Sequence, residues 1–307
     1  MSDAYPDLSL HIGSLVLRNP VMTASGTFGY GKEYKDLLEI ERLGGICTKG
    51  LTLAPRPGNN GIRLHETPSG LINSIGLENP GIKAFIDTEL PALRRLGPVV
   101  IANLSGSSLE DYVEGARLLD RSDIDMIELN ISCPNVKAGG MAFGLCPSDA
   151  AGVTAAVRKA SSKPLMVKLS PNAPDISAVG RACEAAGADA LSLVNTFKAM
   201  AIDTRTAKPV FENISAGLSG PAIRPIALRM VWELCGEVSV PVVGMGGIAT
   251  ANDAIEFIMA GAAAVQVGAA SFARPTAMTE IIDGIKRFMS HNGYRSLKEL
   301  CGAARKQ

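Results

Sequence analysis

The sequence predicts an α/β protein, a (β/α)8 TIM barrel with an N-terminal β-hairpin and long βα-loop insertions over the C-terminal face. From residue 98 onward, short β-branched or apolar runs alternate with Ala/Leu-rich segments of helical period, as in parallel sheets with crossover helices. Eight strands can be counted, and no protected edge strands are recognisable, which favours a closed barrel over an open sheet. Because no linker, low-complexity tract or short repeat interrupts the pattern, we expect one barrel domain over residues 1–307.

The elements are expected in the following order. Residues 8–17 alternate apolar and polar side chains around Gly13, which predicts a hairpin that plugs the lower mouth of the barrel. Strands are expected at residues 20–23, 45–49, 99–103, 126–130, 165–169, 190–194, 240–244 and 264–267. Helices are expected at residues 107–120, 149–160, 176–186, 221–234, 251–260 and 278–290, several of them opened by Ser, Asp or Asn caps. The connections 50–80 and 195–220 are longer than ordinary βα loops and follow strand C-termini, where a barrel carries its chemistry.

Composition excludes several classes of function. With 30 basic and 30 acidic residues the net charge is zero, so nucleic acids and acidic membranes are not expected partners. No apolar stretch approaches the roughly 18 residues of a membrane span, and no signal peptide is recognisable, which predicts a cytoplasmic protein. The six cysteines are scattered without a C-x-x-C pair, so we expect no metal site. With three histidines, none in a catalytic context, hydrolysis through a Ser-His-Asp or Cys-His arrangement is disfavoured.

Polar side chains end five of the predicted strands. A single lysine at a strand end is usually a surface residue whose stem packs on apolar neighbours. Several such residues at one barrel mouth instead indicate a ligand site, because buried polar groups need partners. The residues are Lys49, Asn103, Asn130, Lys168 and Asn195.

Glycines follow the last two strands. The chain reads Gly-Met-Gly-Gly-Ile from residue 244 and Val-Gly-Ala-Ala from residue 267. Backbone N–H groups of such loops can approach a phosphate, and loops seven and eight are the usual phosphate site of these barrels. Gly246 and Gly247 alone could equally form a tight turn. It is their position after the seventh strand of the barrel that favours a phosphate site.

Cys133 lies just beyond the fourth strand, in the string Asn-Ile-Ser-Cys-Pro-Asn. A Gly-rich loop follows at residues 138–144 and could act as a lid. Nearby lysines would favour the thiolate form that a base or nucleophile requires. Cys133 is therefore the candidate reactive thiol, and the other five cysteines are interpreted as packing residues.

Several motifs resemble the class 1 dihydroorotate dehydrogenases, and the resemblance runs nearly end to end. Within class 1, the Ser-Gly-Thr-Phe-Gly-Tyr-Gly segment at residue 25 and the loop 135–144 are similar to type 1B, the catalytic subunit of the NAD-linked enzyme. The departures from the family pattern, at residues 145–147 and 198–200, touch no assigned role. The motifs begin at Asn73 (Asn-Ser-Ile-Gly-Leu-Glu-Asn-Pro-Gly), Asn130 (Asn-Ile-Ser-Cys-Pro-Asn-Val-Lys), Val194 (Val-Asn-Thr), Gly217 (Gly-Leu-Ser-Gly-Pro-Ala) and Gly244 (Gly-Met-Gly-Gly-Ile).

The resemblance implies the reaction and its base. One FMN per chain would lie across the barrel mouth, and (S)-dihydroorotate would be oxidised to orotate in de novo pyrimidine (UMP) biosynthesis. Cys133 would remove the proton at C5 while a hydride passes from C6 to N5 of FMN. Asparagine side chains suit the substrate's amide and imide groups, and a cation suits its carboxylate. The implied substrate-binding residues are Lys49, Asn73, Gly76, Leu77, Asn130, Asn195 and Thr196.

The resemblance also implies how FMN is held. Lys168 would lie near the N1/O2 edge of the flavin and stabilise charge in the reduced ring. Ser25, Gly50 and Asn103 would contact the ring or its side chain, with Lys49, Asn130 and Val194 also assigned to cofactor binding. The ribityl phosphate would be bound by Gly220, Gly246, Gly247, Gly268 and Ala269.

Electrons must then leave the reduced flavin. The chain has neither a G-x-G-x-x-G dinucleotide turn nor an iron–sulfur cysteine cluster. The 1B resemblance therefore implies a partner subunit that carries FAD and a [2Fe-2S] cluster and passes electrons to NAD, in a heterotetramer built on a homodimer of this chain.

Three alternatives remain open at this point. The chain could be a stand-alone, fumarate-using homodimer of type 1A. It could be another FMN barrel that acts on a pyrimidine, similar to dihydropyrimidine dehydrogenase or dihydrouridine synthase. It could also be a non-redox aldolase in which Lys168 or Lys49 forms a Schiff base. A purely structural or binding role would leave the converging Lys, Asn and Cys residues unexplained.

Overall fold

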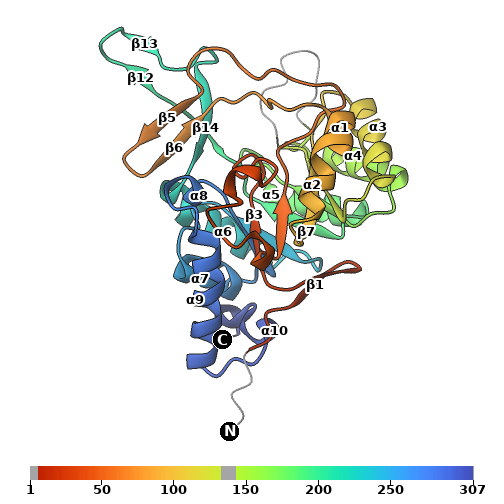
Figure 1. Cartoon of the computed structure of the whole chain (residues 1–307), viewed down its shortest axis with the longest axis vertical. Coiled ribbons are helices and arrows are strands. Elements are labelled where there is room, and N and C mark those ends of the chain that lie inside the picture. The colour runs from red at the N-terminus through yellow and green to blue at the C-terminus, as the bar shows by residue number, and fades with distance from the viewer. Residues whose placement is uncertain (1–5, 133–142, 307) are drawn as a thin grey trace.

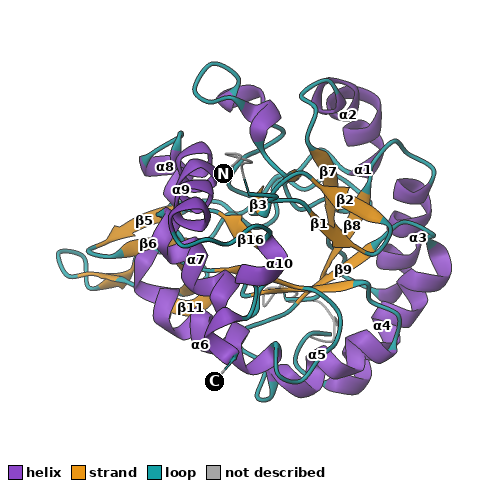
Figure 2. Ribbon diagram, turned by 90° about the horizontal axis from the view of Figure 1, so that it is seen from below, coloured by secondary structure: helices purple, strands orange, loops and turns teal. Residues whose placement is uncertain are grey.

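Eight parallel strands close into a barrel ringed by helices, which confirms the predicted fold class (Figures 1 and 2). The structure is a computed structural model that describes residues 6–132 and 143–306. Sequential strands are neighbours, and the last strand pairs with the first through Val265 and Val21. The strands are β3 (Val21–Thr23), β4 (Gly45–Cys47), β7 (Val99–Leu104), β8 (Met126–Asn130), β9 (Leu165–Lys168), β10 (Ala190–Leu193), β15 (Val242–Met245) and β16 (Ala264–Val267).

Each barrel strand falls where it was expected, with ends that differ by at most two residues. The seventh strand begins at Val242 and not at residue 240, because Pro241 has no N–H with which to join the ladder. The second and sixth strands end at Cys47 and Leu193, before Lys49 and Asn195. These two polar residues therefore belong to the loops at the barrel mouth.

The six expected helices are present and form the outer layer of the barrel. Ser108 and Asp175 accept hydrogen bonds from the backbone of α3 and α5, and Thr250 forms a capping box with Asp253 at α7. No helix in the described part of the chain is long and apolar enough to cross a membrane. The helices are α3 (Leu109–Asp120), α4 (Pro147–Ala160), α5 (Ile176–Ala185), α6 (Arg224–Leu234, after a 3-10 turn at Pro221–Ile223), α7 (Ala251–Met259) and α9 (Ala277–His291).

The first two βα units differ from the expected pattern. After β3 the chain forms two 3-10 helices, Lys32–Tyr34 and Ile40–Arg42, and no α-helix, because Gly29 and Gly31 adopt positive φ angles at the point where a helix would begin. The second unit has a helix that the sequence pattern did not reveal. It runs through α1 (Ile82–Ala84), a π-helical turn (Phe85–Glu89) and α2 (Leu90–Arg94). Shorter elements complete the chain, namely α8 (Ala270–Ala273), α10 (Leu297–Leu300) and a 3-10 turn (Ala303–Arg305).

The two long connections pair with each other above the barrel mouth. They form a four-stranded antiparallel sheet in the order β11-β14-β6-β5, which lies at the upper left of Figure 1. Its small core contains Ile72, Phe211 and Ala216. The insertions expected over the C-terminal face are thus a sheet and not irregular loops. Its strands are β5 (Leu64–Thr67), β6 (Gly70–Asn73), β11 (Phe197–Met200) and β14 (Ser215–Ser219), and a further hairpin joins β12 (Ile202–Asp203) to β13 (Lys208–Pro209).

The N-terminal hairpin lies at the opposite end of the barrel, as predicted. It pairs β1 (Leu10–Ile12) with β2 (Leu15–Leu17). Ile12 and Leu17 are fully buried in the main hydrophobic core, and Gly13 in the turn lies against Asp189, the residue before β10. The hairpin therefore covers the N-terminal ends of the barrel strands.

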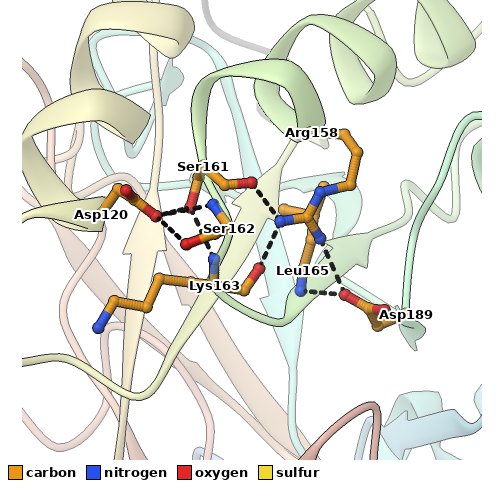
Figure 3. A network of polar contacts seen from close by, with 7 residues as sticks. All are labelled: Asp120, Arg158, Ser161, Ser162, Lys163, Leu165 and Asp189. Carbon is orange, nitrogen blue, oxygen red and sulfur yellow. Dashed lines mark hydrogen bonds and ion pairs between the residues drawn. The ribbon is translucent and has the colours of Figure 1, made fainter.

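A polar network secures the same end of the barrel (Figure 3). The guanidinium of Arg158 donates to the carbonyls of Ser161 and Lys163 and forms an ion pair of 3.0 Å with Asp189. The Asp189 carboxylate also accepts a 2.8 Å hydrogen bond from the N–H of Leu165, the first residue of β9. These contacts join the α4–β9 connection to the start of β10 and so stabilise this end of the barrel.

Four of the five cysteines in the described residues pack against neighbouring side chains, and the fifth is exposed. Cys47 and Cys183 are buried, and Cys235 and Cys301 are half-buried. Cys146 is exposed, so its interpretation as a packing residue was wrong. It occupies the N-cap position before Pro147, where α4 begins at the surface.

Candidate active site

A cavity of about 830 Å³ opens at the C-terminal mouth of the barrel, below the four-stranded sheet. Cys133 and residues 138–142 of the expected lid lie outside the described residues. Every other residue predicted to bind substrate or cofactor lines this one cavity: Ser25, Lys49, Gly50, Asn73, Gly76, Leu77, Asn103, Asn130, Lys168, Val194, Asn195, Thr196, Gly220, Gly246, Gly247, Gly268 and Ala269.

Two lysines supply positive charge to the cavity. Lys168, only 3% exposed at the end of β9, donates a 3.0 Å hydrogen bond to Ser25 Oγ. Lys49 is half-buried, and among the described residues its ammonium makes neither a hydrogen bond nor an ion pair. Burial lowers the pKa of Lys49, although the charge of Glu78 opposes the shift. Lys49 is therefore a cation that an anionic ligand can pair with.

Hydrogen bonds connect three of the asparagines, Asn103 to Asn130 directly and Asn130 to Asn195 through Ser132. Asn130 Nδ2 donates to Asn103 Oδ1 at 3.3 Å, and Asn130 Oδ1 accepts from Ser132 Oγ at 2.7 Å. Asn195 Nδ2 donates to the same hydroxyl at 2.6 Å. The Tyr112 hydroxyl donates to the backbone carbonyl of Asn130 at 2.8 Å. The amides are therefore oriented in advance at the cavity wall, and Ser132 is a contributor that the sequence analysis had not named.

The sheet above the mouth brings in two more predicted residues. Asn73 on β6 pairs with Gly217 on β14 and donates a 3.2 Å hydrogen bond to its carbonyl. A Cβ on Gly217 would lie 2.2 Å from Thr196 Oγ1, so only glycine leaves room for the threonine. Pairing between the two insertions thus places Asn73 beside Thr196.

Asn79 shapes the loop that carries Gly76 and Leu77. Both of these residues have positive φ angles, which are 78° and 57° respectively. The buried Asn79 donates to the Leu77 carbonyl at 2.6 Å and accepts from the N–H groups of Gly81 and Thr52 at 2.9 and 3.1 Å. Its side chain therefore supports the left-handed conformation of Leu77 at the cavity wall.

Glycines at the other side of the cavity form a backbone cradle. Gly220, Gly246 and Gly247 have positive φ angles, and a Cβ on Gly247 would lie 2.7 Å from the Gly220 carbonyl oxygen. Within the described residues, the N–H groups of Gly246, Gly247, Gly268 and Ala269 donate to no acceptor. Unpaired N–H groups that converge on a cavity fit a phosphate. The same glycines can therefore form a tight turn and also bind a phosphate.

A carboxylate that was not singled out from the sequence lies inside the barrel, beneath this cavity. Glu128 on β8 is fully buried and accepts hydrogen bonds from Cys47, Asn103, Ser192 and Gln266. Burial raises its pKa, but the charge of Lys168 and the hydrogen bonds outweigh it, so the pKa of Glu128 is below its ordinary value. The available signal was a glutamate in the middle of the apolar strand Met-Ile-Glu-Leu-Asn.

These features define a (β/α)8-barrel enzyme whose mouth suits a phosphate-bearing group beside an anionic, nitrogen-rich ligand. The family model for dihydroorotate dehydrogenase matches residues 7–289. This chain belongs to the dihydroorotate dehydrogenase family, and the resemblance found in its motifs is confirmed.

Close relatives cover nearly the whole chain. A protein of Petrotoga mobilis is 54% identical over 96% of this chain and 99% of its own length. Relatives from Geotalea daltonii and Pelobacter propionicus are 54% and 53% identical over 98% and 97% of this chain, and over 99% and 98% of their own lengths. All three are named dihydroorotate dehydrogenase B (NAD(+)), catalytic subunit.

Family membership confirms the prediction of an oxidoreductase and argues against the Schiff-base aldolase. The roles of individual residues, the cytoplasmic location and the single-domain organisation stay predictions. In the described ranges, no group of three or more His, Cys, Asp or Glu residues could hold a metal ion. That the chain works without a metal also stays a prediction.

Proposed function

We propose that this chain is the FMN-containing catalytic subunit of an NAD-linked dihydroorotate dehydrogenase, which oxidises (S)-dihydroorotate to orotate in pyrimidine biosynthesis. One observation carries the proposal. A single cavity contains a half-buried ammonium, a set of oriented amides and a cradle of backbone N–H groups, and neither the ammonium nor the cradle N–H groups have a partner among the described residues. The first two suit a substrate with a carboxylate and ring amide groups, and the third suits the phosphate of FMN.

The residues present fit FMN. The glycine cradle would hold the ribityl phosphate, while Ser25, Gly50, Asn103 and Val194 would contact the ring region. When bound, FMN would supply a two-electron acceptor for the hydride that leaves the substrate. Lys168 would place its positive charge at the ring edge, where the reduced cofactor gains negative charge.

The substrate would be held by charge and by paired amides. Lys49 would bind the carboxylate, because no carboxylate of the described chain pairs with it. Asn73, Asn130 and Asn195 offer both donors and acceptors to the ring amide and imide groups. The Thr196 hydroxyl and the backbone of residues 76–77 would complete the contacts. These groups would orient the substrate and exclude alternative poses.

Cys133 would act as the base that takes the C5 proton. The residue follows β8 directly after the described Ser132, and β8 ends at the cavity. The two lysines in the cavity wall would favour a thiolate over a thiol.

A partner subunit would carry the electrons onward. The relatives' name describes a catalytic subunit of an NAD(+) enzyme, which supports a separate subunit for electron transfer. We propose that this partner holds FAD and a [2Fe-2S] cluster and assembles with a homodimer of this chain into a heterotetramer in the cytoplasm.

Turnover of the purified chain tests the proposal. With dihydroorotate and an artificial dye acceptor, the isolated chain should form orotate, detected by its ultraviolet absorbance. NAD⁺ alone should not support turnover until the partner is added. Turnover of the isolated chain with fumarate would instead favour a type 1A enzyme, and failure to form orotate with any acceptor would contradict the proposed substrate.

A further inference from the structure

A polar layer crosses the barrel interior just beneath the cavity. Such interiors are usually filled by branched apolar side chains. Here Glu128 on β8 meets Cys47 on β4, Asn103 on β7, Ser192 on β10 and Gln266 on β16, and all five residues are at most 1% exposed. Five of the eight barrel strands therefore contribute to one buried polar cluster.

The Glu128 carboxylate is saturated with donors. Oε1 accepts from Ser192 Oγ and Gln266 Nε2, both at 2.9 Å. Oε2 accepts from Asn103 Nδ2 at 2.5 Å and from Cys47 Sγ at 3.1 Å. Burying an ionised carboxylate is costly unless hydrogen bonds and a countercharge compensate. The low pKa of Glu128 agrees with a carboxylate that stays charged.

The countercharge is Lys168, which lies above Glu128 in the barrel. In the pairing of β8 with β9, Glu128 is opposite Met166 and Asn130 is opposite Lys168. Lys168 is thus two residues closer to the mouth and on the same face of the sheet. Lys168 lines the cavity, whereas Glu128 lies below it.

The carboxylate determines how two amides are turned. A carboxylate only accepts hydrogen bonds, so Asn103 and Gln266 must present their NH₂ groups to it, and their oxygens must face away. Asn103 Oδ1 would lie 3.1 Å from a Cβ on Gly50, which lines the cavity. Gln266 Oε1 is buried at the cavity and has no partner within the described residues. An unpaired buried acceptor at a cavity indicates a donor on the ligand.

We propose that Glu128 is a positioning residue for the bound flavin. It turns the amide oxygens of Asn103, which also accepts from Asn130 Nδ2, and of Gln266 toward the cavity, where they can accept from the single N–H group of the oxidised ring, at N3, and it places a fixed negative charge beneath Lys168. This inference rests on the proposed function, because it takes FMN as the occupant of the cavity.

Glu128→Gln tests the inference through the midpoint potential of bound FMN. The new amide presents an NH₂ group to donors on one side, so the facing amide must lose its hydrogen bond or turn over. The substitution also removes a negative charge near the ring, which stabilises the more negative reduced flavin. The midpoint potential should become more positive by at least a tenfold change in equilibrium constant, about 30 mV for a two-electron couple.

Ser192→Ala is the matched control. It removes one hydrogen bond to the same carboxylate in the same buried layer but changes neither the charge nor the two amides. Its potential should equal that of the wild type, and Glu128→Asp, which retains the charge, should shift less than Glu128→Gln. An unchanged potential in a folded, FMN-loaded Glu128→Gln protein, or an equal shift in Ser192→Ala, would overturn the inference.

If Glu128→Gln does not fold, a second variant tests the role of the amide oxygen. Gln266→Met removes the free acceptor and retains the Glu128 charge, so FMN affinity, measured by fluorescence titration of the apoprotein, should fall about tenfold. Unchanged affinity and potential in this variant would reject the role of the amide. If the wild-type chain itself bound no FMN, the proposed function would fail first, and that result is distinct from either variant outcome.

Discussion

The ammonium of Lys168 donates a 3.0 Å hydrogen bond to Ser25 Oγ across the barrel mouth. Lys168 ends β9, and Ser25 follows β3, which stands on the opposite side of the closed barrel. The bond therefore holds a buried positive charge over the barrel interior, above Glu128. A charge held in this way needs no reorganisation when negative charge develops in a ligand beside it.

Lys168→Met should impair reduction of the flavin. Loss of the cation destabilises the negative charge of the reduced ring, so the midpoint potential should become more negative and the rate of reduction by dihydroorotate should fall roughly 10²-fold. Stopped-flow absorbance and potentiometry measure the two effects. Lys163→Met is the control, because Lys163 bonds the Ile124 carbonyl outside the cavity. Equal midpoint potentials and equal rates of reduction in the two variants would show that Lys168 does not stabilise the reduced flavin.

Gly247→Ala should weaken FMN binding. The residue has a φ of 73°, and a Cβ would lie 2.7 Å from the Gly220 carbonyl oxygen, so the cradle must distort. We expect FMN affinity to fall at least about tenfold and stability to fall by roughly 1–2 kcal/mol. Fluorescence titration and thermal unfolding of the apoprotein measure these effects.

Gly152→Ala supplies the contrast. Gly152 lies within α4, and a Cβ there would meet no atom within 4 Å. Alanine should raise stability by roughly 0.5–1 kcal/mol and leave FMN affinity unchanged. Equal losses of FMN affinity in both variants would contradict the assignment of the cradle.

The affinity for dihydroorotate should fall at alkaline pH, as Lys49 loses its positive charge. Burial lowers the pKa of Lys49 below the ordinary 10.5, so its positive charge is lost as pH rises through this lowered value. The KM for dihydroorotate should therefore rise with pH before an ordinary lysine would titrate, with a smaller effect on kcat. Arginine stays charged throughout, so Lys49→Arg should lose this alkaline rise. Persistence of the same rise in Lys49→Arg would assign it to another group.

Cys133→Ser should slow flavin reduction by at least about 10²-fold while FMN stays bound, because a hydroxyl is a far weaker base near neutral pH. Cys146→Ser is a matched control, since Cys146 is exposed and does not line the cavity. Anaerobic stopped-flow reduction by dihydroorotate compares the two. Wild-type reduction rates in Cys133→Ser would exclude the thiol as the base.

The barrel could be predicted because each strand is a short apolar run, and six of the eight are followed by a helical pattern. The four-stranded sheet could not, because its pairing joins β6 to β14 across more than one hundred residues and its strands are half-exposed. The helix through Ile82–Ala84 and Leu90–Arg94 was missed because a π-helical turn and Pro91 disturb its period.

The cavity wall could be predicted from strand ends and motifs, but the layer beneath it could not. Asn103 and Lys168 stand at strand ends, where a polar residue is conspicuous in the sequence. Glu128 lies in the middle of β8, and neither it nor Gln266, the last residue but one of β16, was singled out from the sequence. Their hydrogen-bond partners come from other strands that only the closed barrel brings together. Local sequence carries no information about such cross-barrel hydrogen bonds.

The visible spectrum of the purified chain shows whether it binds a flavin that dihydroorotate reduces. It should be recorded without oxygen, before and after addition of dihydroorotate. We expect a flavin band that bleaches on addition of the substrate, which would establish the cofactor, the substrate and the direction of electron flow together. A flavin band that persists would contradict dihydroorotate as the reductant. A chain that is colourless even after reconstitution with FMN would contradict the flavin site itself.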